Sequence, residues 1–178
     1  MTQAFYREGR FGRVHLLTLQ EAEERFERAL FHEAGHAAVA LFAGIRVKHV
    51  KVDADHAVTT RVRSKHPLDG PEIQRRVAFI AAGYLAERRR IPRDRAWARR
   101  CAETDFRDVR RLLARGNHTF GQAGFRLAWR ALTQHWPFVV AISNLVRARG
   151  EAFENELLSL AVAHGVVSVN GRPPSSTR

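Results

Sequence analysis

Two histidines stand four residues apart in the segment FHEAGHAAVALFAG, residues 31–44, and a glutamate follows the first of them. On a helix, residues four apart project from one face, so His32 and His36 could bind one metal ion. Glu33 lies about 100° around such a helix, beside the metal, where it could deprotonate a metal-bound water. The pattern predicts a zinc (Zn²⁺) site with His32 and His36 as ligands and Glu33 as the catalytic general base.

The alternative is an accidental pairing, because the chain has nine histidines and a buried histidine often only satisfies a backbone group. His, Glu and His at this fixed spacing rarely arise by chance. Gly35 adds weight to the metal site, since glycine inside a helix costs up to about 1 kcal/mol relative to alanine. We expect another backbone or a substrate to approach closely at Gly35.

Two histidines leave the site one ligand short, because catalytic zinc usually takes three protein ligands and a water. The metzincin pattern would place glycine and histidine at positions 39 and 42, where this chain has Val39 and Phe42. The third ligand must then come from further along the chain. The acidic candidates are Glu72, Glu87, Glu103, Asp105 and Asp108.

Three blocks of the sequence, HEAGHA at 32–37, AAGYLAERR at 81–89 and ETDFRDVRRL at 103–112, resemble a known family. They are similar to the peptidase domain of the FtsH-type ATP-dependent zinc metalloproteases, standing alone without the ATPase module or membrane anchor. The resemblance implies a zincin-like, FtsH-peptidase-like helical domain with Asp105 as third zinc ligand. It also implies that Glu87 is a buried supporting residue. Thr104 stands where the family has asparagine, so Glu87, Glu103 and Asp108 stay open as alternatives to Asp105.

The hydrophobic periodicity predicts a mainly α chain with a small antiparallel β-sheet, an α+β class. A long helix at 17–44 should begin with a capping box of Thr18 and Glu21 and end at Gly44. Two strands should follow at 45–53 and 56–64, the first with Ile45, Val47 and His49 on one face and Arg46, Lys48 and Val50 on the other. Further helices are expected at 71–91, 104–116 (closed by Gly116), 121–134, 137–149 and 151–164, with a linker of uncertain shape at 91–103.

The domain organisation follows from the same pattern. We expect a basic N-terminal arm at 1–17, a single zinc-peptidase-like domain at 18–165 and a flexible C-terminal tail at 166–178. The one cysteine, Cys101, permits no internal disulfide and favours a reducing compartment. No stretch approaches the roughly 20 apolar residues of a membrane helix, and the start lacks an apolar signal core. These features favour a cytoplasmic protein without membrane association.

The chain is strongly basic, with a net charge of +12 and a pI near 11.4. Such a field attracts nucleic acid or acidic partners. The positive residues are nearly all arginine and spread along the whole chain, and no nucleic-acid-binding motif accompanies them. Nucleic acid is therefore a less favoured partner than a peptide.

The sequence favours a zinc metallopeptidase that cuts flexible or unfolded protein segments. No GxxxxGK[ST] phosphate loop occurs, so folded substrates would need a separate ATPase or unfoldase as partner. Two alternatives remain. One is a metal-containing regulatory or binding protein of the same fold without turnover, and the other is a basic nucleic-acid-associated protein. The oligomeric state does not follow from the sequence.

Overall fold

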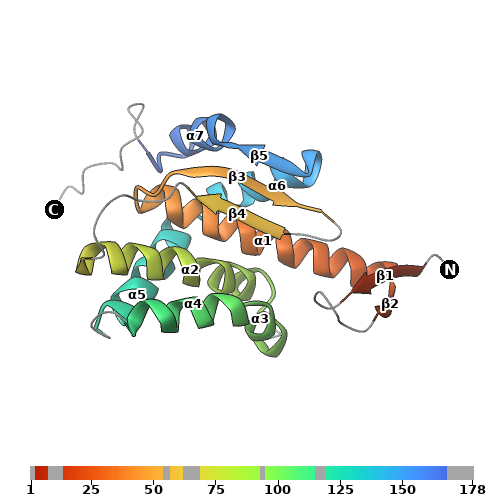
Figure 1. Cartoon of the computed structure of the whole chain (residues 1–178). Helices are drawn as coiled ribbons and strands as arrows, with labels where there is room; N and C mark the ends of the chain where they lie inside the picture. Colours follow the sequence, from red (N-terminus) through yellow and green to blue (C-terminus); the bar gives the residue numbers. More distant parts are fainter. Residues whose placement is uncertain are drawn as a thin grey trace.

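Helices dominate the fold, and a small antiparallel sheet covers one side of the longest helix (Figure 1). The computed structural model describes residues 3–7, 14–53, 57–61, 69–92, 95–114 and 119–167. The predicted α+β class, mainly α with a small antiparallel sheet, is confirmed. The elements are β1 Gln3–Arg7, β2 Val14–Thr18, α1 Leu19–Phe42, β3 Val47–Val52, β4 Ala57–Arg61, α2 Gly70–Arg90, α3 Arg95–Cys101, α4 Glu103–Leu113, α5 Thr119–Gln134, α6 Trp136–Arg149, β5 Glu151–Phe153 and α7 Glu154–Ala163.

Helix α1 has the two ends that the sequence predicts. The Thr18 hydroxyl accepts a bond from the backbone N–H of Glu21, and the Glu21 carboxylate accepts one from the backbone N–H of Thr18. This capping box satisfies amide groups that the first turn leaves without helical partners. At the other end Gly44 takes a φ of 75°, which an L side chain rarely adopts. These local signals fix where the helix that carries His32 and His36 begins and ends.

Helices α1 and α2 pack closely because both present small residues at their contact. A Cβ atom on Gly35 would lie 2.5 Å from Cβ of Ala86 and 2.8 Å from the carbonyl oxygen of Ala82. Both distances are shorter than real Cβ atoms show, so a side chain at position 35 would push α2 away. The close approach that the sequence predicts at Gly35 is confirmed, and the second backbone is that of α2.

The main sheet has three antiparallel strands in the order β4–β3–β5. Strand β3 carries a register shift between Val47 and His49, and Val47, Val50 and Val52 are all buried. The predicted placement of Val50 on the face of Arg46 and Lys48, opposite Val47, was wrong, because the irregularity changes which face the following residues occupy. Residues 151–153, predicted to open the last helix, instead form β5 and pair with β3.

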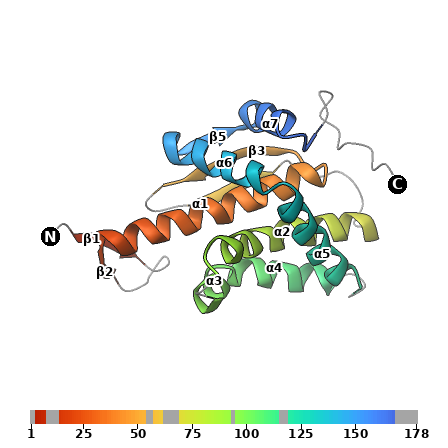
Figure 2. The ribbon, with the colours of Figure 1, turned by 180° about the vertical axis from the view of Figure 1, so that it is seen from behind.

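Helix α6 and strand β4 lie on opposite sides of α1. Strand β4 is in front of α1 in Figure 1, and α6 is in front of α1 in Figure 2, which is the view from behind. Helices α4 and α5 pack against α2 below the sheet. The core thus extends from the sheet through α1 to α2. Helix α4 packs on α2, and this packing brings the start of α4 next to the histidines of α1.

Several predicted segments differ from the structure at their ends. The N-terminal arm contains an antiparallel hairpin of β1 and β2, and the linker at 91–103 contains α3. Val166 and Val167, the first residues of the predicted tail, are buried in the main core. Gly116, residues 56 and 62–64 of the predicted second strand, and the tail from 168 lie outside the described residues. Among the helices that are described, none is long and apolar enough to cross a membrane.

Candidate metal centre

His32, His36 and Asp105 meet where α1 faces the first turn of α4. Oδ2 of Asp105 lies 3.0 Å from Nε2 of His32 and 3.4 Å from Nε2 of His36. One ligand atom from each residue can be chosen so that all three lie within 4.8 Å of one another. Ligand atoms at about 2.0–2.1 Å from one tetrahedral zinc lie roughly 3.3 Å apart, so these separations suit a single ion.

The tautomer of His36 favours metal binding. Its Nδ1 lies 2.7 Å from the backbone carbonyl oxygen of Phe79, which can only accept, so Nδ1 carries the hydrogen. In the neutral ring Nε2 then has a free lone pair, and it points at another acceptor, the carboxylate of Asp105. Two acceptors face each other favourably only with a cation, either a proton or a metal ion, between them. A backbone carbonyl that orients a histidine in this way is the usual support of a metal ligand.

Gly83 of α2 leaves open the space beside both histidines. A Cβ atom at this position would lie 2.5 Å from Nε2 of His32 and 2.5 Å from Nε2 of His36. These two nitrogens are the ones that face Asp105. Glycine at position 83 therefore keeps a side chain out of the place where the ligand atoms converge.

Glu87 lies behind His32, on the side away from Asp105. Its Oε2 is 3.5 Å from Nδ1 of His32, a long contact, and Nδ1 has no closer hydrogen-bond partner among the residues described. The carboxylate is almost fully buried and also lies 3.5 Å from the guanidinium of Arg28. A carboxylate in this position orients the imidazole and raises its basicity as a ligand.

The carboxylates control the charge of the site. Burial by itself lowers the pKa of His32, but the carboxylates of Asp105 and Glu87 outweigh it and raise that pKa to about 10. Burial raises the pKa of Asp105, yet its contacts with His32 and His36 bring it well below its usual value. In the metal-free protein His32 thus carries a proton at neutral pH. A metal ion must displace this proton, so metal affinity should fall as the pH falls.

Glu33 is buried beside the histidines without joining the ligand cluster. It is 7 % exposed, and its charge contributes to the raised pKa of His32. Its backbone carbonyl accepts a 3.0 Å hydrogen bond from the hydroxyl of Thr59 in β4. Strand β4, which is an outer strand of the sheet, therefore runs alongside the predicted base.

Aromatic contacts hold α4 in the position that brings Asp105 to the histidines. Phe106, the next residue, meets the Tyr84 ring of α2 edge-on at 5.0 Å and stacks on Phe125 of α5 at 6.5 Å. Asp105 itself stands in the first turn of α4, where a carboxylate is favoured by the helix dipole.

Apart from Glu87, the other acidic candidates, Glu72, Glu103 and Asp108, do not belong to the cluster of His32, His36 and Asp105. Glu72 binds Arg75 and Arg76 on its own helix, and Asp108 is exposed and pairs with Arg111. Glu103 is exposed at the start of α4. Sequence reasoning overlooked Gly83, although a glycine inside the helical pattern AAGYLAE is the same signal that drew attention to Gly35.

A family model described as Peptidase M50B-like matches residues 25–87. The match spans about a third of the chain and includes His32, Glu33, His36, Gly83 and Glu87, but ends before Asp105. It supports a metallopeptidase family, and so a metal cofactor, without pointing specifically to the FtsH type. No curated protein matches the chain at a significant level.

Gly83→Ala should weaken metal binding without removing a ligand. Alanine is the better helix former, so α2 gains propensity by up to about 1 kcal/mol, while the added methyl group collides with both Nε2 atoms. We expect metal affinity, measured by competition with a chromogenic chelator, to fall at least about tenfold, as it does when the surroundings of a ligand are disturbed.

Gly121→Ala is the matched control, because the three atoms nearest to a Cβ there all belong to the flexible Leu113 side chain, the closest at 2.9 Å. Unchanged metal affinity in Gly83→Ala, with the fold intact, would show that the ligand atoms do not converge beside Gly83.

Proposed function

We propose that this protein is a zinc-dependent metallopeptidase that hydrolyses peptide bonds in flexible or unfolded protein segments. In this proposal His32, His36 and Asp105 bind zinc and Glu33 is the general base, in a domain that resembles the FtsH-type peptidases. The observation that carries the proposal is the meeting of two Nε2 atoms and one carboxylate oxygen beside Gly83. The Peptidase M50B-like match supports the metallopeptidase class independently.

The donor set suits zinc. Two imidazoles and one carboxylate are typical of catalytic zinc sites that keep a further position for water or substrate. When bound, zinc supplies Lewis acidity, which polarises a carbonyl oxygen and makes water a stronger nucleophile at neutral pH. The backbone carbonyl of Phe79 and the carboxylate of Glu87 would keep the two histidines in ligand orientation.

Glu33 would do the proton chemistry. Its place next to His32 in α1 puts its carboxylate beside the ligands, and its burial strengthens electrostatic interactions there. The carboxylate would accept a proton from the attacking water and pass it to the leaving amine of the cleaved peptide bond.

Strand β4 offers a place for an extended substrate. It is an outer strand of the sheet, it is tied to the backbone of Glu33 through Thr59, and its Val58 is 43 % exposed. A peptide that adds to such an edge forms main-chain hydrogen bonds irrespective of its sequence. Only flexible segments can adopt this extended form, so folded proteins would first need a separate ATPase or unfoldase.

Zinc content and proteolysis together test the function. We expect about one zinc per chain by elemental analysis and chelator-sensitive cleavage of an unstructured protein such as casein. His32→Ala/His36→Ala should lose both. Metal content unchanged in this double variant would contradict the site. A wild-type protein with full zinc that cuts neither casein nor a peptide library would instead be the metal-containing binding protein of the same fold.

A further inference from the structure

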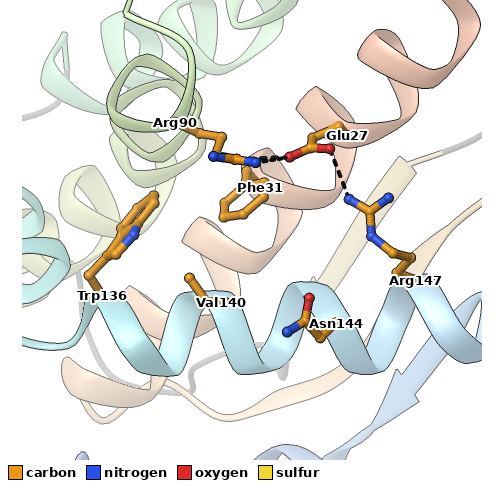
Figure 3. A pocket seen from close by; sticks show the side chains of 7 residues that line it. All are labelled: Glu27, Phe31, Arg90, Trp136, Val140, Asn144 and Arg147. Carbon is orange, nitrogen blue, oxygen red and sulfur yellow. Dashed lines mark hydrogen bonds and ion pairs between the residues drawn. The ribbon is translucent and has the colours of Figure 1, made fainter. Parts of the chain in front are cut away.

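A pocket lies between α1, the end of α2 and α6, and Figure 3 shows the side chains that line it. Its volume is about 330 Å³, at the small end of the range for ligand pockets. Glu27 and Phe31 come from α1, Arg90 from α2, and Trp136, Val140 and Arg147 from α6. The metal centre uses none of these residues.

One wall of the pocket is formed by two aromatic rings. The rings of Phe31 and Trp136 stack with their centroids 5.7 Å apart and their planes 18° apart. The guanidinium of Arg89 lies 4.6 Å from the Trp136 ring and donates to the carbonyl oxygen of Leu132, which holds that ring in place. Such a wall favours an apolar group of the ligand.

Two arginines that share one carboxylate lie beside these rings, as Figure 3 shows. The guanidinium of Arg90 is 5.1 Å from the centre of the Phe31 ring. Oε1 of Glu27 accepts bonds from Nε and Nη2 of Arg90 at 2.8 and 2.6 Å, and Oε2 accepts one from Nη2 of Arg147 at 3.1 Å. Burial raises the pKa of Glu27, but the two guanidinium groups outweigh it and hold the pKa below its usual value. The carboxylate is thus ionised, and the group as a whole keeps one uncompensated positive charge.

Each arginine also keeps donors for a ligand. The bonds to Glu27 leave Nη1 of Arg90 and both Nη1 and Nε of Arg147 without a hydrogen-bond partner in the described part of the chain. Both side chains are about half exposed, so a ligand can reach them. Guanidinium groups bind carboxylates through paired, planar hydrogen bonds.

We propose that this pocket binds a carboxylate carried on an apolar body, such as the C-terminus of a peptide that ends in an apolar residue. The apolar body would lie on Phe31 and Trp136, and the carboxylate would face Arg90 and Arg147. Inorganic phosphate fits less well, because it has no apolar group to cover the aromatic wall. The proposal does not depend on the metal centre or on peptidase activity.

N-acetylphenylalanine tests the proposal as a mimic of a peptide C-terminus, and 3-phenylpropionate as a free apolar acid. Binding to the full chain would be followed by amide shifts in ¹H–¹⁵N NMR spectra, with Kd expected at roughly 0.1–1 mM for ligands of this size. The amide of N-acetylphenylalanine, acetate and phosphate should each bind at least about fivefold more weakly. The titration is repeated with His36→Ala, which separates this pocket from carboxylate binding at a metal ion.

Two variants should change the affinity for the acid in opposite directions. Arg147→Gln removes a donor and should weaken binding at least about fivefold, whereas Glu27→Gln removes the competing carboxylate and should tighten it by a similar factor. Arg149→Gln is the matched control on α6, because its guanidinium pairs with Glu156 instead. If Arg147→Gln does not fold, Asn144→Asp adds a negative charge at the exposed rim and should likewise weaken binding.

Binding of N-acetylphenylalanine would show that the pocket accepts the C-terminus of a peptide. Binding of 3-phenylpropionate alone would show that the ligand is instead a free apolar acid. The proposal is overturned if neither acid binds, if acid and amide bind equally, or if phosphate binds as well as the acids. It is also overturned if Glu27→Gln weakens binding in a folded protein, since the three side chains would then only tie α1, α2 and α6 together.

Discussion

Replacing Glu33 with glutamine should leave zinc bound while peptide hydrolysis falls by about 10²–10⁴. Glutamine keeps the size of the side chain, so the buried place beside His32 stays filled. The amide cannot accept a proton from water, so the variant lacks the base. The proposed ligand atoms belong to His32, His36 and Asp105, so the substitution removes no metal ligand.

The experiment needs zinc content and rate from the same preparation. Elemental analysis gives the metal, and release of fluorescent fragments from labelled casein gives the rate. Glu24→Gln is the matched control, because Glu24 is an exposed glutamate of the same helix whose carboxylate accepts a hydrogen bond from the Gln20 side chain. Wild-type activity in Glu33→Gln would exclude Glu33 as the base, and loss of zinc would show that its charge is needed to hold the ion.

Local signals in the sequence were sufficient for the long helix α1 but not for the short helix α3 or for the details of the sheet. The capping box at Thr18 and the glycine at position 44 act within a few residues, so the limits of α1 could be predicted. The irregularity in β3 arises from pairing with β4, which no local pattern encodes. Strand β5 has only three residues and exists because β3 lies beside it, so its sequence looked like the start of α7.

In the candidate site too, the residues of one helix could be predicted, whereas those brought in by tertiary packing could not. His32, Glu33 and His36 are spaced by a single helix, so their grouping follows from the helical repeat. Asp105 comes from a different helix, and only the resemblance to a known family favoured it over the other acidic residues. Its place beside the histidines depends on the packing of Phe106 against Tyr84 and Phe125, which is a tertiary contact. The role of Gly83 depends on the packing of α2 against α1, which the sequence pattern does not encode.

Asp105→Ala should lose zinc affinity and activity together. The substitution removes the charged one of three protein ligands and leaves two imidazoles, so we expect zinc affinity to fall at least about 10²-fold. Affinity would be measured by competition with a chelator of known strength, and activity with casein at saturating zinc. Asp108→Ala is the matched control, because Asp108 is an exposed aspartate of the same helix that pairs with Arg111 away from the histidines.

Glu87 provides the sharpest comparison with Asp105, because both carboxylates contact His32 from opposite sides. Glu87→Gln keeps a hydrogen-bond acceptor near Nδ1 of His32, so zinc affinity should fall by only about 10–100-fold. Glu87→Ala also leaves Arg28 without that buried carboxylate and should destabilise the fold, which thermal unfolding would show. If Asp105→Ala kept its zinc while the folded Glu87→Gln variant lost it, the imidazole of His32 would have to bind through Nδ1. The third ligand would then be Glu87, and α4 would serve only to cover the site.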